Sequence, residues 1–210
     1  MTCAHSRWGA ATRPTYPAVW GGPHFAAPAR FWDRSPGWLL PAPHQAGTIS
    51  VMHLRLADAG DLATLEDMLL EAVNWSPDRN QLTLEELRAN DMLVRYVEEW
   101  PRDGDAGVIA EGDDGVLGAA WFRRFARGRP GFGFIDEFTP ELSVAVAPGW
   151  RNRGVGSELL VALIEVGRER RFDGLALSVE SRNRAVQLYR RIGFVVAVDE
   201  NGSYTMRLQL

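Results

Sequence analysis

A short stretch rich in Gly and Arg holds the residues best suited to chemistry in this chain. Residues 144–157 read VAVAPGWRNRGVGS, which is a strand-like run, a turn and the start of a helix. Gly154 and Gly156 let the backbone approach a ligand without an intervening Cβ. The first N–H groups of a helix have no intrahelical partner, and the helix dipole favours an anion beside them. With the charges of Arg151 and Arg153, the stretch predicts a loop that binds a pyrophosphate.

Other kinds of phosphate and catalytic site are excluded by residue types that the chain lacks. A dinucleotide fingerprint needs a third Gly where Leu159 stands, and a Walker loop needs a Lys. All 23 basic residues are Arg, which also excludes a Schiff-base lysine and a lysine general base. The single Cys, Cys3, permits neither an intrachain disulfide nor a Cys metal cluster, and no metal site is predicted.

A second informative segment follows about 30 residues after the first. Residues 183–194 read NRAVQLYRRIGF. The two segments, in this order and separated by one helix and one strand, resemble the GCN5-related N-acetyltransferase (GNAT) family. The first resembles the family's acetyl-CoA motif, and the likeness extends over residues 53–210 because the order of the expected elements is also similar.

The resemblance implies both a fold and a set of site residues. The fold would be α/β, a mixed sheet of about six to seven strands with helices on both faces and two splayed central parallel strands. The activity would be transfer of an acetyl group from acetyl-CoA, as co-substrate, to an amine. By the same resemblance, the backbone of Val144 and Val146 and the side chain of Asn183 would hold the pantetheine arm, and Tyr189 would stand near the sulfur as an acid. The pyrophosphate would lie on Arg151, Arg153, Gly154, Val155, Gly156 and Ser157.

The residue types present limit which groups could deprotonate the attacking amine. Residues 52–210 contain no Cys, no Lys and one His, His53, at the start of the first expected strand. A covalent acyl-Cys route is therefore closed there, which leaves direct transfer in a ternary complex. The base is then a carboxylate, a water held by one, or no residue at all. Glu141 stands at the head of the acetyl-CoA strand, where the resemblance places a base, and Glu137 is the second candidate.

Hydrophobic periodicity predicts the elements that must position these residues. An apolar stripe at three- and four-residue spacing marks helices, and alternation marks strands. Helices are expected over 60–73, from Thr83 to about Trp100, over 154–171 and over 183–192. Strands are expected over 53–57, 107–111, 116–124, 142–146, 175–179, 194–198 and 204–208, with a hairpin turn at 112–115.

Residues 1–51 differ in composition from the rest. They hold seven of the 12 Pro and four of the eight Trp, and no stretch shows sustained periodicity. One interpretation is a disordered arm that docks through its aromatic residues. The favoured one is a non-native extension, upstream sequence read in frame before a start at Met52. The domain organisation predicted is thus an extension over 1–51 and an acetyltransferase domain over 52–210.

Charge and composition limit the classes of partner that the chain is expected to bind. Residues 52–210 carry 19 Arg and 26 acids, and this negative body argues against a nucleic-acid binder. No apolar run is long enough for a membrane span, no secretory signal is visible, and a cytoplasmic location is expected. A homodimer is left open.

The acceptor is expected to be a small-molecule or peptide amine. Its pocket could have an apolar wall made of Trp75, Phe132, Phe134 and Phe138. Two alternatives stay open: a non-catalytic module of the same fold that binds acetyl-CoA or acts as a sensor, and an acetyltransferase acting on peptide or protein N-termini.

Overall fold

The structure is a computed structural model that describes residues 52–113 and 115–210. The predicted extension 1–51 and Asp114 of the predicted hairpin turn lie outside the described residues. The strands are β1 (His53–Leu56), β2 (Ala106–Gly112), β3 (Gly115–Arg123), β4 (Glu141–Val146), β5 (Gly174–Glu180), β6 (Val195–Glu200) and β7 (Ser203–Gln209). The helices are α1 (Leu62–Val73), α2 (Leu84–Ala89), α3 (Asp91–Val94), α4 (Val155–Glu169) and α5 (Ala185–Ile192), with short 3-10 turns at Ala59–Asp61 and Pro148–Trp150.

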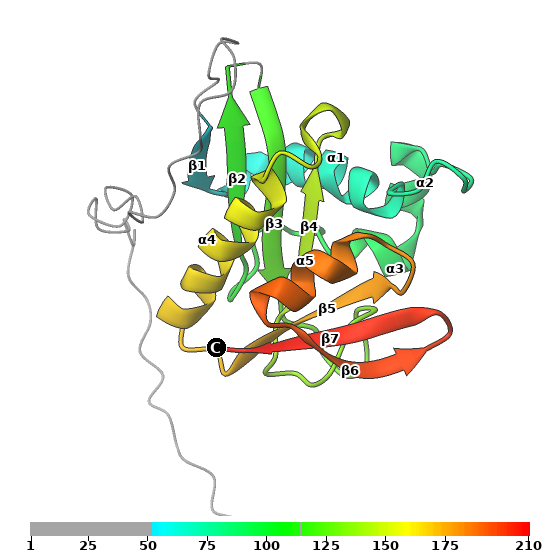
Figure 1. The fold of residues 1–210 in the computed structure, drawn as a ribbon, viewed down its shortest axis with the longest axis vertical. Coiled ribbons are helices and arrows are strands. Elements are labelled where there is room, and N and C mark those ends of the chain that lie inside the picture. Colours follow the sequence, from blue (N-terminus) through cyan, green and yellow to red (C-terminus); the bar gives the residue numbers. More distant parts are fainter. Residues whose placement is uncertain (1–51, 114) are drawn as a thin grey trace, which may run out of the picture. The chain divides into compact units, whose positions relative to one another are not determined.

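All seven strands belong to one mixed sheet, in the order β1-β2-β3-β4-β5-β7-β6. The β4–β5 pair is parallel and every other neighbouring pair is antiparallel. A parallel pair needs a crossover, and α4 supplies it. In Figure 1, α4 lies in front of β2 and β3, whereas α1 passes behind the sheet. The predicted fold class, a mixed sheet with helices on both faces, is confirmed.

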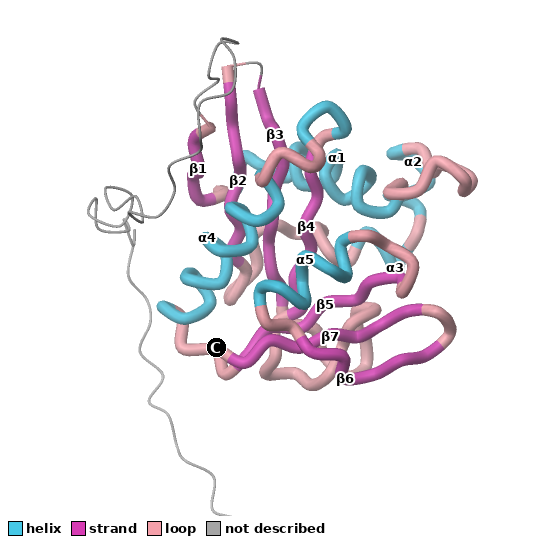
Figure 2. Tube along the Cα trace, viewed as in Figure 1, coloured by secondary structure: helices cyan, strands magenta, loops and turns pink. Residues whose placement is uncertain are grey.

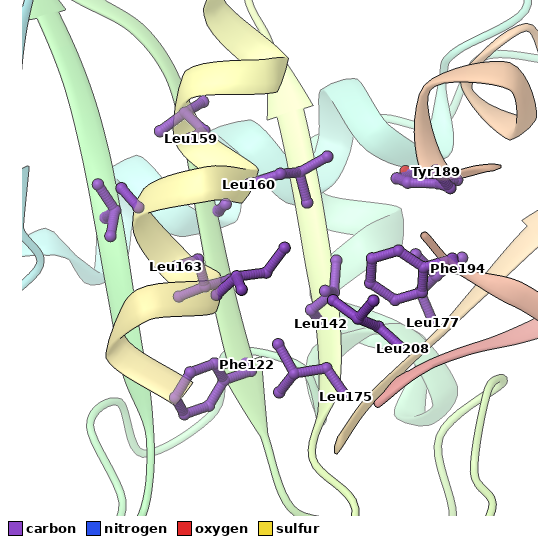
Figure 3. Packing of buried hydrophobic residues seen from close by; sticks show 14 of the residues in the cluster. Phe122, Leu142, Leu159, Leu160, Leu163, Leu175, Leu177, Tyr189, Phe194 and Leu208 are labelled. Atoms are coloured by element: carbon purple, nitrogen blue, oxygen red, sulfur yellow. The ribbon is translucent and has the colours of Figure 1, made fainter. Parts of the chain in front are cut away.

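Each face of the sheet has its own hydrophobic cluster. Figure 3 shows Leu159, Leu160 and Leu163 of α4 packed over side chains of the sheet, with Tyr189 and Phe194 beside them. The second cluster joins α1 and the α2–α3 segment to the other face through buried Leu65, Leu69, Tyr96 and Trp121. The apolar stripe predicted for α4 explains this packing, because every third or fourth residue faces the sheet.

The single helix expected from Thr83 to about Trp100 is wrong. The structure has two short helices, α2 and α3, followed by turns as far as Trp100 (Figure 2). The break falls at Asn90, whose backbone is extended and whose Oδ1 accepts a hydrogen bond of 3.0 Å from the Met92 N–H. An Asn side chain that bonds to nearby backbone competes with helix continuation, so Asn90 ends one helix and caps the next.

Candidate active site

The two parallel strands separate soon after they meet. In register, β4 and β5 are paired only at Glu141 and Ala176, and the Ala176 N–H donates to the Pro140 carbonyl at 2.8 Å. Beyond this point the strands diverge, and Figure 1 shows β5 turning away from the direction of β4. The splay implied by the resemblance is therefore present.

A cleft of about 1180 Å³ opens at the splay. Its lining comes from segments that are distant in sequence: α1 and the loop after it, β4, the loop before α4, β5 and α5. Sequence-predicted residues that line it are Glu141, Val144, Val146, Arg151, Gly154, Gly156, Ser157, Asn183 and Tyr189.

The backbone of β4 presents unpaired groups to this cleft. On one side the Ala147 N–H donates to the Leu117 carbonyl of β3 at 2.9 Å, and on the other the Pro140 carbonyl bonds to β5. Because backbone groups of a strand alternate in direction, the N–H and C=O groups of Val144 and Val146 point to the β5 side. There β5 has already moved away, so an extended ligand could pair with this edge.

The loop before α4 offers free N–H donors. The Ser157 N–H already donates to the Gly154 carbonyl at 2.8 Å, but within the described residues nothing accepts from the N–H groups of residues 152–156. Gly154 has a φ of +90°, which an L side chain rarely adopts, and a Cβ there would enter open space. Gly154 itself lines the cleft, so a side chain there would lie beside these donors.

Three predicted loop residues contribute differently from what their types suggest. The Arg151 guanidinium is already engaged, because it donates to Glu71 Oε2 at 2.8 Å and to the Val146 carbonyl at 3.1 Å. Arg153 lies over the Trp150 ring at 5.1 Å, outside the cleft lining. The Val155 side chain is buried in the core cluster. The side chains at these three positions therefore have contacts of their own within the described residues.

Glu141 is a buried carboxylate in the cleft wall. Its Oε1 accepts hydrogen bonds from the Tyr96 hydroxyl at 2.6 Å and from the Gly133 N–H at 2.8 Å. Its Oε2 is buried without a hydrogen-bond partner among the described residues. Burial raises the pKa of Glu141 to about 7, although both hydrogen bonds lower it. A carboxyl group with a pKa near neutral suits proton transfer at physiological pH.

Glu137, the second carboxylate candidate, lies elsewhere. It is exposed on the loop before β4, and its Oε1 accepts the Arg127 N–H at 2.9 Å. It does not line the cleft. Of the two candidates, the structure brings only Glu141 to the splayed strands.

Asn183 lies two residues before α5, and Tyr189 lies within that helix. Asn183 Oδ1 accepts the N–H of Ala185, the first residue of α5, at 2.9 Å, and Asn183 also lines the cleft. The Tyr189 ring is buried edge-on to Phe194 at 5.9 Å, and burial raises the pKa of its hydroxyl. The Tyr189 hydroxyl has no hydrogen-bond partner in the described part of the chain and is available to a ligand.

The expected aromatic wall is half present. Trp75 and Phe132 line the cleft, together with Leu69, Leu93 and Tyr96, whereas Phe134 packs on the hydrophobic cluster behind the sheet. Phe138 is 79% exposed on the surface and does not line the cleft. Sequence reasoning missed Tyr96, because its partners are 36 and 45 residues away and no local pattern marks it.

Two kinds of site find no support in the described residues. They contain no group of three or more His, Cys, Asp or Glu that could hold a metal ion. No helix in this part of the chain has the length and apolar character needed to cross a membrane.

Comparison with known proteins places this site in a family. The model of the Acetyltransferase (GNAT) family matches residues 68–194. A mycothiol acetyltransferase of Acidimicrobium ferrooxidans is 35% identical over 137 residues, which is 62% of this chain and 40% of that protein. The chain thus spans about two fifths of the length of that relative.

Solved structures extend the likeness. A ribosomal-protein-alanine N-acetyltransferase from Brucella melitensis is 30% identical with a TM-score of 0.55, over 75% of this chain and 99% of that one. The yncA protein of Salmonella typhimurium, solved with its cofactor acetyl-CoA, is 26% identical with a TM-score of 0.56, over 77% of this chain and 95% of that one.

Proposed function

The chain belongs to the GNAT acetyltransferase family, and on that premise we propose that it transfers an acetyl group from acetyl-CoA directly to a primary amine. One observation carries the proposal. A single cleft joins the free edge of β4, the unpaired donors before α4 and the buried carboxylate of Glu141. An extended amide-bearing arm, a pyrophosphate and an amine are the three groups that these features would bind.

The cleft fits acetyl-CoA on the chemistry of its donors. The N–H groups of residues 152–156 and the start of α4 would hold the pyrophosphate, because they are unpaired and lie at the positive end of a helix dipole. The backbone of Val144, the Val146 N–H and the side chain of Asn183 would hold the pantetheine amides, whereas the Val146 carbonyl already accepts from Arg151. Acetyl-CoA supplies an activated thioester, and the Val146 N–H would donate to its carbonyl oxygen.

Glu141 would take the proton from the attacking amine. An ammonium ion has no lone pair, so the amine must be neutral when it attacks. With its pKa of about 7, Glu141 is half ionised at neutral pH and can accept this proton directly or through one water. Its buried Oε2, which has no hydrogen-bond partner among the described residues, would gain a hydrogen bond in doing so.

Tyr189 would donate a hydrogen bond to the departing sulfur. Because burial raises the pKa of Tyr189, the hydroxyl stays protonated at neutral pH and can serve as a donor. A CoA thiolate is less basic than such a phenolate, so a strong hydrogen bond is enough to stabilise the sulfur and complete proton transfer is not required. Within residues 52–210 there is no Cys to carry the acetyl group, which favours direct transfer in a ternary complex.

The acceptor end of the cleft favours an amine attached to an apolar group. Leu69, Leu93, Trp75 and Phe132 line it together with the buried carboxylate of Glu141. The names of the relatives suggest two acceptor classes, a small-molecule amine and a protein N-terminal amine. Both classes present a primary amine, and the apolar wall would favour acceptors in which the group attached to the amine is apolar.

The test is a panel of acceptors followed by release of free CoA. The panel should contain phenethylamine, spermidine, glucosamine, free alanine and a short peptide with an N-terminal Ala. We expect CoA release with phenethylamine or the peptide, and slower release with the highly polar amines. A protein that binds acetyl-CoA tightly but releases no CoA with any of them would be a binding module instead of an enzyme.

A further inference from the structure

Tyr96 connects the carboxylate of Glu141 to the loop in front of it. Its hydroxyl donates to Glu141 Oε1 and accepts from the Phe132 N–H, each at 2.6 Å. The neighbouring Gly133 N–H donates to the same carboxylate oxygen at 2.8 Å. The Gly133 N–H and the Tyr96 phenol therefore meet at one carboxylate oxygen of Glu141, and the Phe132 N–H holds the phenol in place.

The backbone that carries Tyr96 is held from below by two side chains of β3. Trp121 Nε1 donates to the Tyr96 carbonyl at 3.0 Å, and Arg123 Nη1 donates to the Arg95 and Glu98 carbonyls at 2.7 and 2.9 Å. Arg123 is itself buried in an ion pair with Asp105. These bonds add to the local backbone hydrogen bonds of the turns after α3, such as the one from the Tyr96 N–H to the Leu93 carbonyl at 3.1 Å.

Aromatic packing fixes the ring of Tyr96 as well. The ring lies edge-on to Phe125 at 5.0 Å and is stacked with Phe132 at 6.0 Å. The phenol is only 5% exposed, so its hydroxyl cannot turn to bulk water. It is consequently preorganised toward Glu141.

We propose that Tyr96 is a positioning residue that orients Glu141 for the acceptor amine. The inference rests on the proposed function, because it assigns a partner to the proposed base. Two donors occupy Oε1, which leaves Oε2 as the oxygen without a hydrogen-bond partner among the described residues. Gly131 lies against Oε2, and a Cβ at that position would come within 2.2 Å of it, so a side chain there would displace the carboxylate.

The charged groups around Glu141 come from several elements. Arg123 is opposite Glu141 in β3, but its guanidinium forms an ion pair with Asp105. Arg207 lies two strands away in β7. Arg95 follows α3 and donates to the Pro130 carbonyl. Tyr96 is the titratable group that contacts Glu141 itself. A change confined to the Tyr96 hydroxyl therefore alters the pKa of Glu141 and leaves these charges in place.

The direction of the effect follows from the hydrogen bond. The bond from Tyr96 stabilises the ionised carboxylate and lowers the pKa of Glu141. Tyr96→Phe removes it, so the acid limb of the kcat/KM profile should move to higher pH. A hydrogen bond to a charged group contributes about 1.5–3 kcal/mol, which corresponds to a shift of about one to two pH units.

The experiment compares the pH profile of kcat/KM for wild type, Tyr96→Phe and the control Tyr204→Phe, with the acceptor found in the panel. Tyr204 lies in β7 outside the cleft lining, so removal of its hydroxyl in Tyr204→Phe should leave the pH profile of kcat/KM unchanged. For Tyr96→Phe we expect about a 10-fold loss at pH 6 and recovery toward wild type at pH 9. The rise in melting temperature caused by acetyl-CoA should persist, because the phosphate site is separate.

A second substitution keeps the Tyr96 hydroxyl and should shift the acid limb of the kcat/KM profile in the opposite direction. Site-specific 3-fluorotyrosine at position 96 makes the phenol a stronger donor, and the acid limb should then move to lower pH. A uniform loss at every pH in Tyr96→Phe, or a limb that neither substitution moves, would show that Tyr96 only supports the fold. Absence of transfer by wild type would overturn the proposed function and this inference together, whereas an unshifted limb in an active enzyme overturns the inference alone.

Discussion

Replacing Glu141 by Gln should increase the stability of the protein at alkaline pH while it lowers activity. Burial raises the pKa of this carboxyl from 4.5 to about 7. Below pH 4.5 the group is protonated in both the folded and the unfolded chain. As the pH rises, the unfolded chain loses its proton first, so the folded state becomes less stable until the pH passes the folded pKa.

The size of the effect follows from the two pKa values of 4.5 and about 7. Each pKa unit corresponds to about 1.36 kcal/mol, so ionised Glu141 costs about 3 kcal/mol of folding free energy at high pH. Gln resembles the protonated acid, because its oxygen can still accept from Tyr96 and Gly133. The variant should therefore gain about 2.5 kcal/mol relative to wild type between pH 5 and pH 8.5.

The assay is urea unfolding of both proteins across this pH range, with the difference in unfolding free energy taken at each pH. Any fixed effect of the buried amide cancels, because only the change with pH is compared. The matched control is Glu137→Gln, which removes an exposed carboxylate on the loop before β4, outside the cleft lining. A flat difference for Glu141→Gln would refute the argument that Glu141 is ionised at a cost in the cleft wall.

Four further results are expected. Gly154→Asp should abolish the rise in melting temperature caused by acetyl-CoA, because it places a negative charge among the unpaired N–H groups; Gly149→Asp, where a Cβ also meets nothing, should retain that rise. Tyr189→Phe should lower kcat at least 10-fold with nearly unchanged acetyl-CoA affinity, and more than half of wild-type kcat would exclude the donor role. Phe132→Ala should raise KM for an apolar amine several-fold more than for a polar one, as measured by CoA release. A chain that begins at Met52 should match the full chain in melting temperature and turnover, because residues 52–210 form both hydrophobic clusters and the cleft described; loss of solubility or activity on truncation would contradict this.

The order of the elements could be predicted from the sequence because local pattern determines it. The apolar stripe of α4 and the alternation in the strands reflect the faces that these elements bury. The helix expected from Thr83 to about Trp100 was wrong because Asn90 caps locally and the following turns are held by distant residues. Trp121 and Arg123 supply those bonds from β3, and no pattern within the segment reveals them.

The candidate site divides in the same way. Gly154 and Gly156 line the cleft, and their spacing alone indicated a backbone that a ligand could approach. The side chain of Arg151 was expected to bind phosphate, but Glu71 on α1 engages it, and that partner is 80 residues away. Glu137 and Glu141 are only four residues apart in sequence, and tertiary packing determines that Glu137 is exposed and Glu141 is buried.

The most direct test of the central claim is a single-turnover experiment with the protein in excess over [14C]acetyl-CoA and one acceptor amine. We expect label to move from CoA to the amine with equimolar release of CoA and no label to be retained on the protein. Glu141→Gln should slow transfer by about 10²–10⁴-fold at pH 7. Label found on the protein, or transfer by Glu141→Gln at the wild-type rate, would contradict direct transfer assisted by Glu141.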